Sequence, residues 1–213
     1  MLCHLIVKRG SRLRYGGQTM KPDKTALLVM DYQNDIVHEN GKFAAWGLAA
    51  HVQQQKAIEN TAAMLTKARK AGVKVLYIKV EHARGYPEIK NSKIGMYQGM
   101  KEAGALIEGE WGAQIHDAVK PLQGEKVLVK RRINPFTIPT LEAELQGMET
   151  LLLAGVATNF VLEECARTAA ANDYEVIVLE DCCASLNQAM HDFPIKNILP
   201  NLVIVTNSKE VTF

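Results

Sequence analysis

The sequence lacks the features of a secreted, membrane-spanning or nucleic-acid-binding protein. Its 213 residues include four cysteines, which form no Cys-x-x-Cys pair and no framework typical of a small secreted domain. No apolar run approaches the ~20 residues needed to cross a bilayer. The net charge is only +2, so no overall field selects nucleic acid or an acidic membrane surface. We therefore expect reduced thiols and a cytoplasmic location.

Motifs for common cofactors and metals are also missing. No GxGxxG follows an apolar strand and no GxxxxGK[ST] is present, so neither a dinucleotide site nor a P-loop is indicated. The six histidines do not pair at the spacing of metal ligands. We expect no cofactor and no bound metal.

Six short apolar segments alternate with stretches of helical character. The first, Thr25-Ala-Leu-Leu-Val-Met30, is apolar throughout and is typical of a strand buried on both faces. We expect the six strands at residues 25–30, 73–80, 126–130, 150–155, 175–179 and 202–206. We expect helices at residues 51–71, 140–146, 159–172 and 191–199, with Thr140 as a cap, and a long loop over residues 82–110. The alternation is typical of a doubly wound parallel α/β sheet.

The length fits one large domain, which we place at residues 20–213. Residues 1–19 contain several basic residues and only a short apolar stretch. We expect them to form an N-terminal extension outside the main fold.

Polar residues follow three of the expected strands. Asp31 follows the first strand, Lys130 ends the third, and Thr158-Asn159 opens the helix after the fourth. Ligands of such sheets bind at the carboxyl ends of the strands, near the point where strand order reverses. An aspartate and a lysine that meet there form an ion pair able to move protons. From position alone, the alternative is a turn residue at Asp31 and a solvated strand end at Lys130.

Several motifs, taken in order, resemble those of the isochorismatase-like hydrolase family. Asp31-Tyr-Gln-Asn-Asp35 resembles the family's D-x-Q-N-D motif, and Glu108-Gly-Glu-Trp-Gly112 resembles E-G-T-W-G. Lys130-Arg-Arg-Ile-Asn-Pro-Phe136 resembles K-x-x-x-S-A-F, and Gly155-Val-Ala-Thr-Asn159 resembles G-V-A-T-N. The resemblance implies a three-layer α-β-α, Rossmann-like fold with a six-stranded parallel sheet of order 3-2-1-4-5-6. It also implies a small-molecule substrate and a homo-oligomer, either a dimer or a tetramer.

The resemblance also implies roles for individual residues, with one departure from the family pattern. Asp31 corresponds to the general base and Lys130 to its charged partner. The family's cysteine nucleophile stands two residues after the asparagine of G-V-A-T-N, where this chain has Val161. Valine has no nucleophilic atom. By resemblance, the Val156–Ala157 peptide bond is cis, and backbone N–H groups at Val156, Ala157 and Val161 serve as oxyanion donors.

Cys165 follows Val161 by one helical turn. It is either a relocated nucleophile or a small core residue on a helix that packs against the sheet. We expect Cys182 and Cys183 to be packed residues, and His82 and Arg84 to lie at the pocket rim or the surface. Further substrate-binding candidates, for each of which a purely structural role is the alternative, are Gln33, Trp111, Asn134, Phe136, Asn159 and Phe160.

Three functions remain open at this stage. An isochorismatase-type hydrolase delivers a proton from Asp31 to the carbon of a vinyl ether before water attacks, and it needs no thiol. An amide or ureide hydrolase uses Asp31 to activate water, or uses Cys165 as the nucleophile. A non-catalytic binding protein keeps the pocket without turnover.

Overall fold

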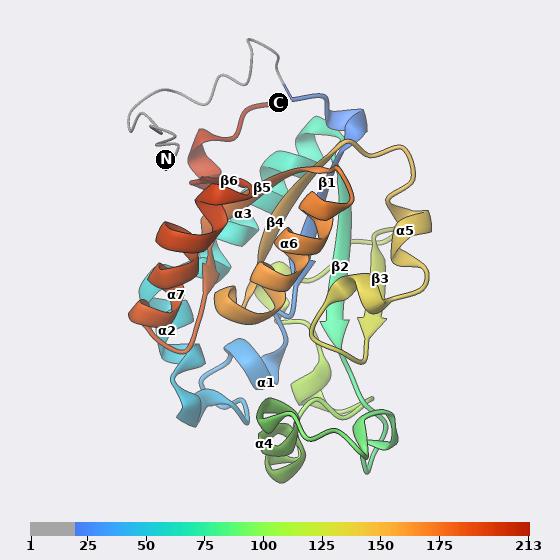
Figure 1. Cartoon of the computed structure of the whole chain (residues 1–213), viewed down its shortest axis with the longest axis vertical. Helices are drawn as coiled ribbons and strands as arrows, with labels where there is room; N and C mark the ends of the chain where they lie inside the picture. Colours follow the sequence, from blue (N-terminus) through green and yellow to red (C-terminus); the bar gives the residue numbers. More distant parts are fainter. Residues whose placement is uncertain (1–19) are drawn as a thin grey trace, which may run out of the picture.

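A central parallel sheet organises residues 20–213, the part of the chain that the computed structural model describes (Figure 1). The expected extension, residues 1–19, lies outside the described residues. The strand order is β3-β2-β1-β4-β5-β6, and every neighbouring pair is parallel. The strands are β1 (Thr25–Met30), β2 (Lys74–Val80), β3 (Lys126–Lys130), β4 (Thr150–Val156), β5 (Glu175–Ala184) and β6 (Ile204–Thr206). The predicted fold class and strand order are confirmed.

Helices cover both faces of the sheet, so the molecule has three layers (Figure 1). The helices are α1 (Asn34–Val37), α2 (Leu48–Gln55), α3 (Ala57–Ala71), α4 (Gly95–Ala103), α5 (Leu141–Glu144), α6 (Glu163–Ala171) and α7 (Gln188–Phe193). Alternate residues of each strand enter opposite cores. Leu27 and Val29 pack with α2 and α3, whereas Ala26 and Leu28 pack with α5 and α6. Burial on both faces explains why β1 and β4 are apolar throughout. No helix of residues 20–213 is long and apolar enough to span a bilayer.

Two segments differ from the helical predictions because tertiary packing overrides the local pattern. The expected helix over residues 51–71 is divided at Lys56, whose φ of 54° ends α2 and begins α3. The expected loop over residues 82–110 contains α4. Its Gly95 and Gly99 weaken the helical signal, but buried Tyr97 and Met100 anchor the helix to the fold.

Strand and helix ends account for the remaining differences. Strand β5 continues to Ala184, past the polar pair at residues 180–181, because its last residues pair with the end of β4. Thr140 precedes α5 but makes no side-chain cap hydrogen bond, so the predicted cap is wrong; its backbone is already helical rather than extended. A π-helical turn, Thr158–Leu162, precedes α6, and another, Pro194–Ile198, follows α7.

Candidate active site

Asp31 and Lys130 meet at the carboxyl ends of the strands. Asp31 directly follows β1, with φ of 60°, and its backbone N–H donates to the carbonyl of Ile78 in the neighbouring strand. The Nζ of Lys130 lies 2.7 Å from Oδ2 of Asp31 and donates to the carbonyl of Ile133 at 3.0 Å. Both side chains are buried. The second carboxylate oxygen of Asp31, Oδ1, is buried without a hydrogen-bond partner among the described residues.

The environment of Asp31 shifts the pKa of its carboxyl. Burial raises the pKa of this carboxyl above its ordinary value of 3.8, and the positive charge and hydrogen bond of Lys130 act in the opposite direction. The carboxyl therefore holds its proton to higher pH than an exposed aspartate does. Such a group can both release a proton and take one back during a reaction.

The ion pair faces a cavity of about 390 Å³, a volume typical of small-molecule sites. Three charged side chains line it, Asp31, Lys130 and Arg132. The rest of the lining is mainly apolar and includes Phe43, Trp46, Leu48, Met96, Met100 and Phe160. Helix α4, which the sequence did not predict, therefore supplies part of the wall.

The turn between β4 and α6 forms another part of this wall. The peptide bond between Val156 and Ala157 is cis. Both residues line the cavity, as does Val161, whose side chain is buried. Among the residues that line the cavity in the described part of the chain, none is a cysteine, serine, threonine or histidine. The pocket thus joins a proton-transfer group to a surface with none of the usual nucleophiles.

Cys165 lies outside this cavity lining. Its side chain is fully buried in the core between α6 and the sheet, and burial raises the pKa of its thiol to about 12. A thiol with this pKa is protonated at neutral pH, whereas the thiolate is the reactive form. The geometry supports the core role of Cys165. Cys182 and Cys183 are likewise fully buried.

Of the six candidate substrate-binding residues, Phe160 lines the cavity, and the other five are not among its lining residues. Gln33 instead joins two segments, because its amide bonds to both backbone groups of Val80 and to the carbonyl of Ala113. Asn134 accepts from the N–H of Phe136 and donates to Thr168.

The remaining three substrate-binding candidates, Asn159, Phe136 and Trp111, also make structural contacts. Asn159 accepts a hydrogen bond from the hydroxyl of Ser185. Phe136 packs against the core beneath α6. Trp111 is half-exposed, with its ring edge-on to His38 at a centroid distance of 5.1 Å. Their contacts lie with neighbouring loops and with the core.

Asp35 and Gly112 explain why two of the family-like motifs contain these residue types. The carboxylate of Asp35 accepts from the backbone N–H groups of Lys42 and Leu106, and Leu106 lines the cavity. A Cβ at Gly112 would lie 2.1 Å from this carboxylate, so only glycine fits. The two motifs therefore hold one wall of the pocket together.

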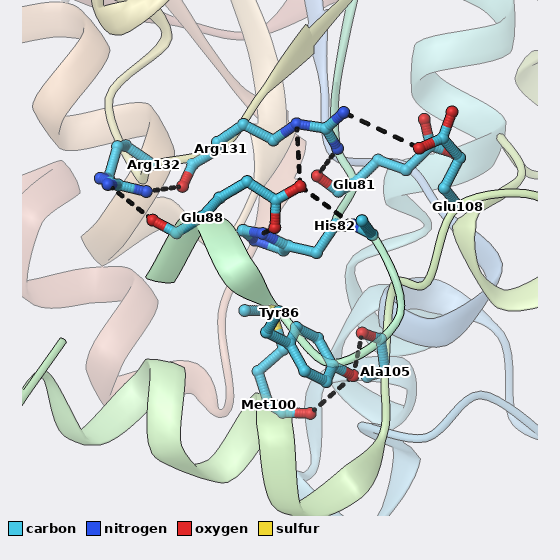
Figure 2. A network of polar contacts seen from close by, with 10 residues as sticks. Glu81, His82, Tyr86, Glu88, Met100, Ala105, Glu108, Arg131 and Arg132 are labelled. Carbon is cyan, nitrogen blue, oxygen red and sulfur yellow. Dashed lines mark hydrogen bonds and ion pairs between the residues drawn. The ribbon is translucent and has the colours of Figure 1, made fainter. Parts of the chain in front are cut away.

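A polar network lies beside the site, around the end of β2 (Figure 2). His82 was expected at the rim or surface, but its side chain is fully buried, with Nδ1 3.3 Å from Glu88. Burial lowers the pKa of His82. Arg84 is exposed and pairs with Glu110 at 2.7 Å. In residues 20–213, no group of three or more His, Cys, Asp or Glu side chains is arranged to hold a metal ion.

Several residues of the cavity wall were not predicted from the sequence, because they come from segments without a recognisable motif. They include Phe43, Trp46, Met96 and Met100. Arg132 was also missed, although it stands two residues after Lys130. Its place directly after a strand end was the available signal.

Comparison with known proteins identifies the family. The model of the isochorismatase domain matches residues 25–210. The chain belongs to the isochorismatase family. It is 31% identical over 170 residues to an uncharacterized isochorismatase family protein of Bacillus subtilis, covering 79% of this chain and 82% of that protein. Family membership, predicted from the motifs, is confirmed.

Two other relatives have more specific names. A ureidoacrylate amidohydrolase of Rhizobium rhizogenes is 30% identical over 178 residues, covering 76% of this chain and 71% of that protein. A protein of Arabidopsis thaliana named "Probable inactive nicotinamidase" is 30% identical over 172 residues, covering 78% of this chain and 84% of that protein. The relatives of this chain thus include both an amidohydrolase and a protein named as inactive.

Solved structures show the same fold. An isochorismatase family protein of Desulfovibrio vulgaris has a TM-score of 0.75 at 25% identity, with 88% of this chain and 95% of that chain covered. A cysteine hydrolase of Pseudomonas syringae has a TM-score of 0.76 at 20% identity, with 96% of each chain covered.

Proposed function

We propose that this protein hydrolyses a small molecule through proton transfer by Asp31, with water as the attacking group and no covalent intermediate. The observation that carries the proposal is the buried Asp31–Lys130 pair at the cavity, in which Oδ1 of Asp31 has no hydrogen-bond partner among residues 20–213. A buried oxygen without a partner is costly unless a ligand or water completes it. Within residues 20–213 the cavity lining offers no cysteine, serine or threonine as a nucleophile, and the thiol of Cys165 is buried outside it.

Hydrolysis of a vinyl ether fits the raised pKa of Asp31 best. The protonated carboxyl donates its proton to the terminal carbon of the double bond, which leaves an oxocarbenium ion. Water adds to this cation, and the hemiketal breaks its C–O bond to give a ketone and an alcohol, while the proton released returns to Asp31. Lys130 stabilises the carboxylate that forms when Asp31 gives up its proton, because its ammonium is 2.7 Å away.

Hydrolysis of an amide or ureide is the second candidate, and the ureidoacrylate amidohydrolase among the relatives favours it. In this reaction Asp31 takes a proton from the attacking water. Backbone N–H groups in the turn around Ala157 are the candidate donors to the oxyanion. The two candidates place opposite demands on Asp31, since the first needs its acid form and the second its carboxylate.

A hydrolase screen on the wild type and Asp31→Asn, run in parallel, tests the proposal. The panel contains vinyl ethers, amides and ureides, with Asp117→Asn as the matched control because the side chain of Asp117 is 96% exposed. General acid–base catalysis contributes roughly 100-fold or more. We expect turnover by the wild type and the control, and a loss of this size in Asp31→Asn.

Two outcomes contradict the proposal. Equal turnover by the wild type and Asp31→Asn would show that Asp31 is not catalytic. Binding of panel members without any turnover would instead support a non-catalytic homologue, the role that the name of the Arabidopsis relative suggests.

A further inference from the structure

Arg132 lines the cavity, and within residues 20–213 its guanidinium has only backbone carbonyls as partners. Nη1 donates to the carbonyl of Arg131 at 2.8 Å, and Nη2 donates to the carbonyl of Glu88 at 2.9 Å (Figure 2). A guanidinium has more N–H donors than these two carbonyls use. The carbonyls therefore fix its position and leave donors available to a ligand.

The neighbouring arginines, unlike Arg132, lie within ion-pair distance of carboxylates. Arg131 lies 3.9 Å from Glu88 and 4.0 Å from Glu108 (Figure 2). Arg84 pairs with Glu110. In residues 20–213, Arg132 has no carboxylate within ion-pair distance. Its charge is thus uncompensated, although acidic side chains occur on the same network.

With Asp31 ionised, the cavity lining carries one uncompensated positive charge. In that state Asp31 and Lys130 neutralise each other at 2.7 Å, which leaves Arg132 as the remaining charged residue of the lining. Asp31 and Lys130 are buried, whereas Arg132 is exposed. The charge of Arg132 is therefore accessible to solvent, whereas the ion pair is not.

We infer that the ligand of this pocket is a small monoanionic carboxylate with an apolar body, and that Arg132 binds its carboxylate. The planar guanidinium matches a carboxylate in a bidentate arrangement, which a lysine does not reproduce. The apolar body lies against side chains such as Met96, Met100 and Phe160. The placement of the scissile bond at Asp31 rests on the proposed function; the carboxylate preference does not.

Calorimetric titration with two acids and their primary amides tests the inference. The probes are phenylpropanoate and phenylbutanoate, each with the amide of the same carbon chain. The proteins are the wild type, Arg132→Met, Arg132→Lys and, as a control, Arg84→Met, whose side chain is 77% exposed outside the cavity lining. We expect the wild type and the control to bind the acids about tenfold more tightly than the amides.

This preference should disappear in Arg132→Met and fall in Arg132→Lys, while the amides bind all four proteins alike. Equal affinity of the wild type for acid and amide would overturn the inference. So would an unchanged preference in Arg132→Met, or no binding of either acid at millimolar concentration. The titration measures binding and needs no turnover. If the activity screen fails while the wild type still prefers the acids over the amides, only the proposed function is refuted.

Discussion

The two oxygens of the Asp31 carboxyl have different surroundings. Oδ2 is bonded to Lys130, whereas Oδ1 is buried and has no hydrogen-bond partner in the described part of the chain. This asymmetry lets the residue keep its partner while it moves a proton. A vinyl ether needs the acid form, so its kcat/KM should fall as pH rises through the pKa of Asp31, which burial places above 3.8.

Lys130→Met should move this decline to higher pH, because the variant lacks the charge that lowers the pKa of Asp31. The pH dependence of kcat/KM for both proteins checks this. A profile that rises with pH would indicate the base role of an amide or ureide hydrolase. The same midpoint in both proteins would show that Asp31 does not set the profile.

By resemblance to the family motif, Val161 corresponds to the usual cysteine, and it lies in the cavity wall near the start of the helical segment. A thiol near a helix N-terminus has a lowered pKa, so Val161→Cys should form a reactive thiolate. We expect this variant to gain amidase turnover that iodoacetamide abolishes, while the wild type is insensitive to the reagent. A variant that folds normally but gains no such turnover would mean that more than the thiol is missing.

At the scale of elements, the loop around Gly112 is fixed by the carboxylate of Asp35. A Cβ at Gly112 would lie 2.1 Å from this group, whereas one at Gly95 meets nothing within 4 Å. Overpacking of this kind costs about 1–3 kcal/mol. Urea denaturation should show that loss for Gly112→Ala and little change for Gly95→Ala, and equal stability of the two variants would contradict the packing account.

Helix α7 contains a histidine that makes stability depend on pH. His191 is buried, with Nδ1 2.8 Å from the hydroxyl of Thr158 and its ring 5.5 Å from that of His51. Burial, followed by the charge of His51, lowers its pKa from 6.5 to about 4. Between these values the unfolded chain binds more protons, so the free energy of unfolding decreases as pH falls through this window.

The decrease in the free energy of unfolding that is due to His191 should amount to roughly 1–3 kcal/mol. Denaturation at several pH values should show a flatter pH dependence for His191→Gln than for the wild type. If His191→Gln kept the full slope, another group would be responsible.

At the same scale, the sequence predicted strands more reliably than helices. Strands β1 and β4 are buried on both faces, so continuous apolar runs identify them. Helix α4 has two glycines and depends on tertiary contacts of Tyr97 and Met100, which no local pattern shows. The break at Lys56 is hidden because the apolar positions continue from α2 into α3.

At the scale of the whole molecule, the fold follows from the order of its apolar strands and from the family motifs. The meeting of Asp31 and Lys130 followed from the rule that parallel strands end at one edge of the sheet. The wall residues of the pocket were harder to predict, because segments distant in sequence, such as those of Phe43, Met96 and Leu186, meet only after folding. The expected homo-oligomer stays a prediction.

The central claim is that turnover depends on the Asp31 carboxyl and on no thiol. The most direct measurement is kcat/KM of Asp31→Asn and of Cys165→Ala with the same substrate, each relative to the wild type. The account predicts a loss of about 100-fold or more for Asp31→Asn and a change within about twofold for Cys165→Ala. The reverse result, with Cys165→Ala folded but inactive and Asp31→Asn active, would contradict it.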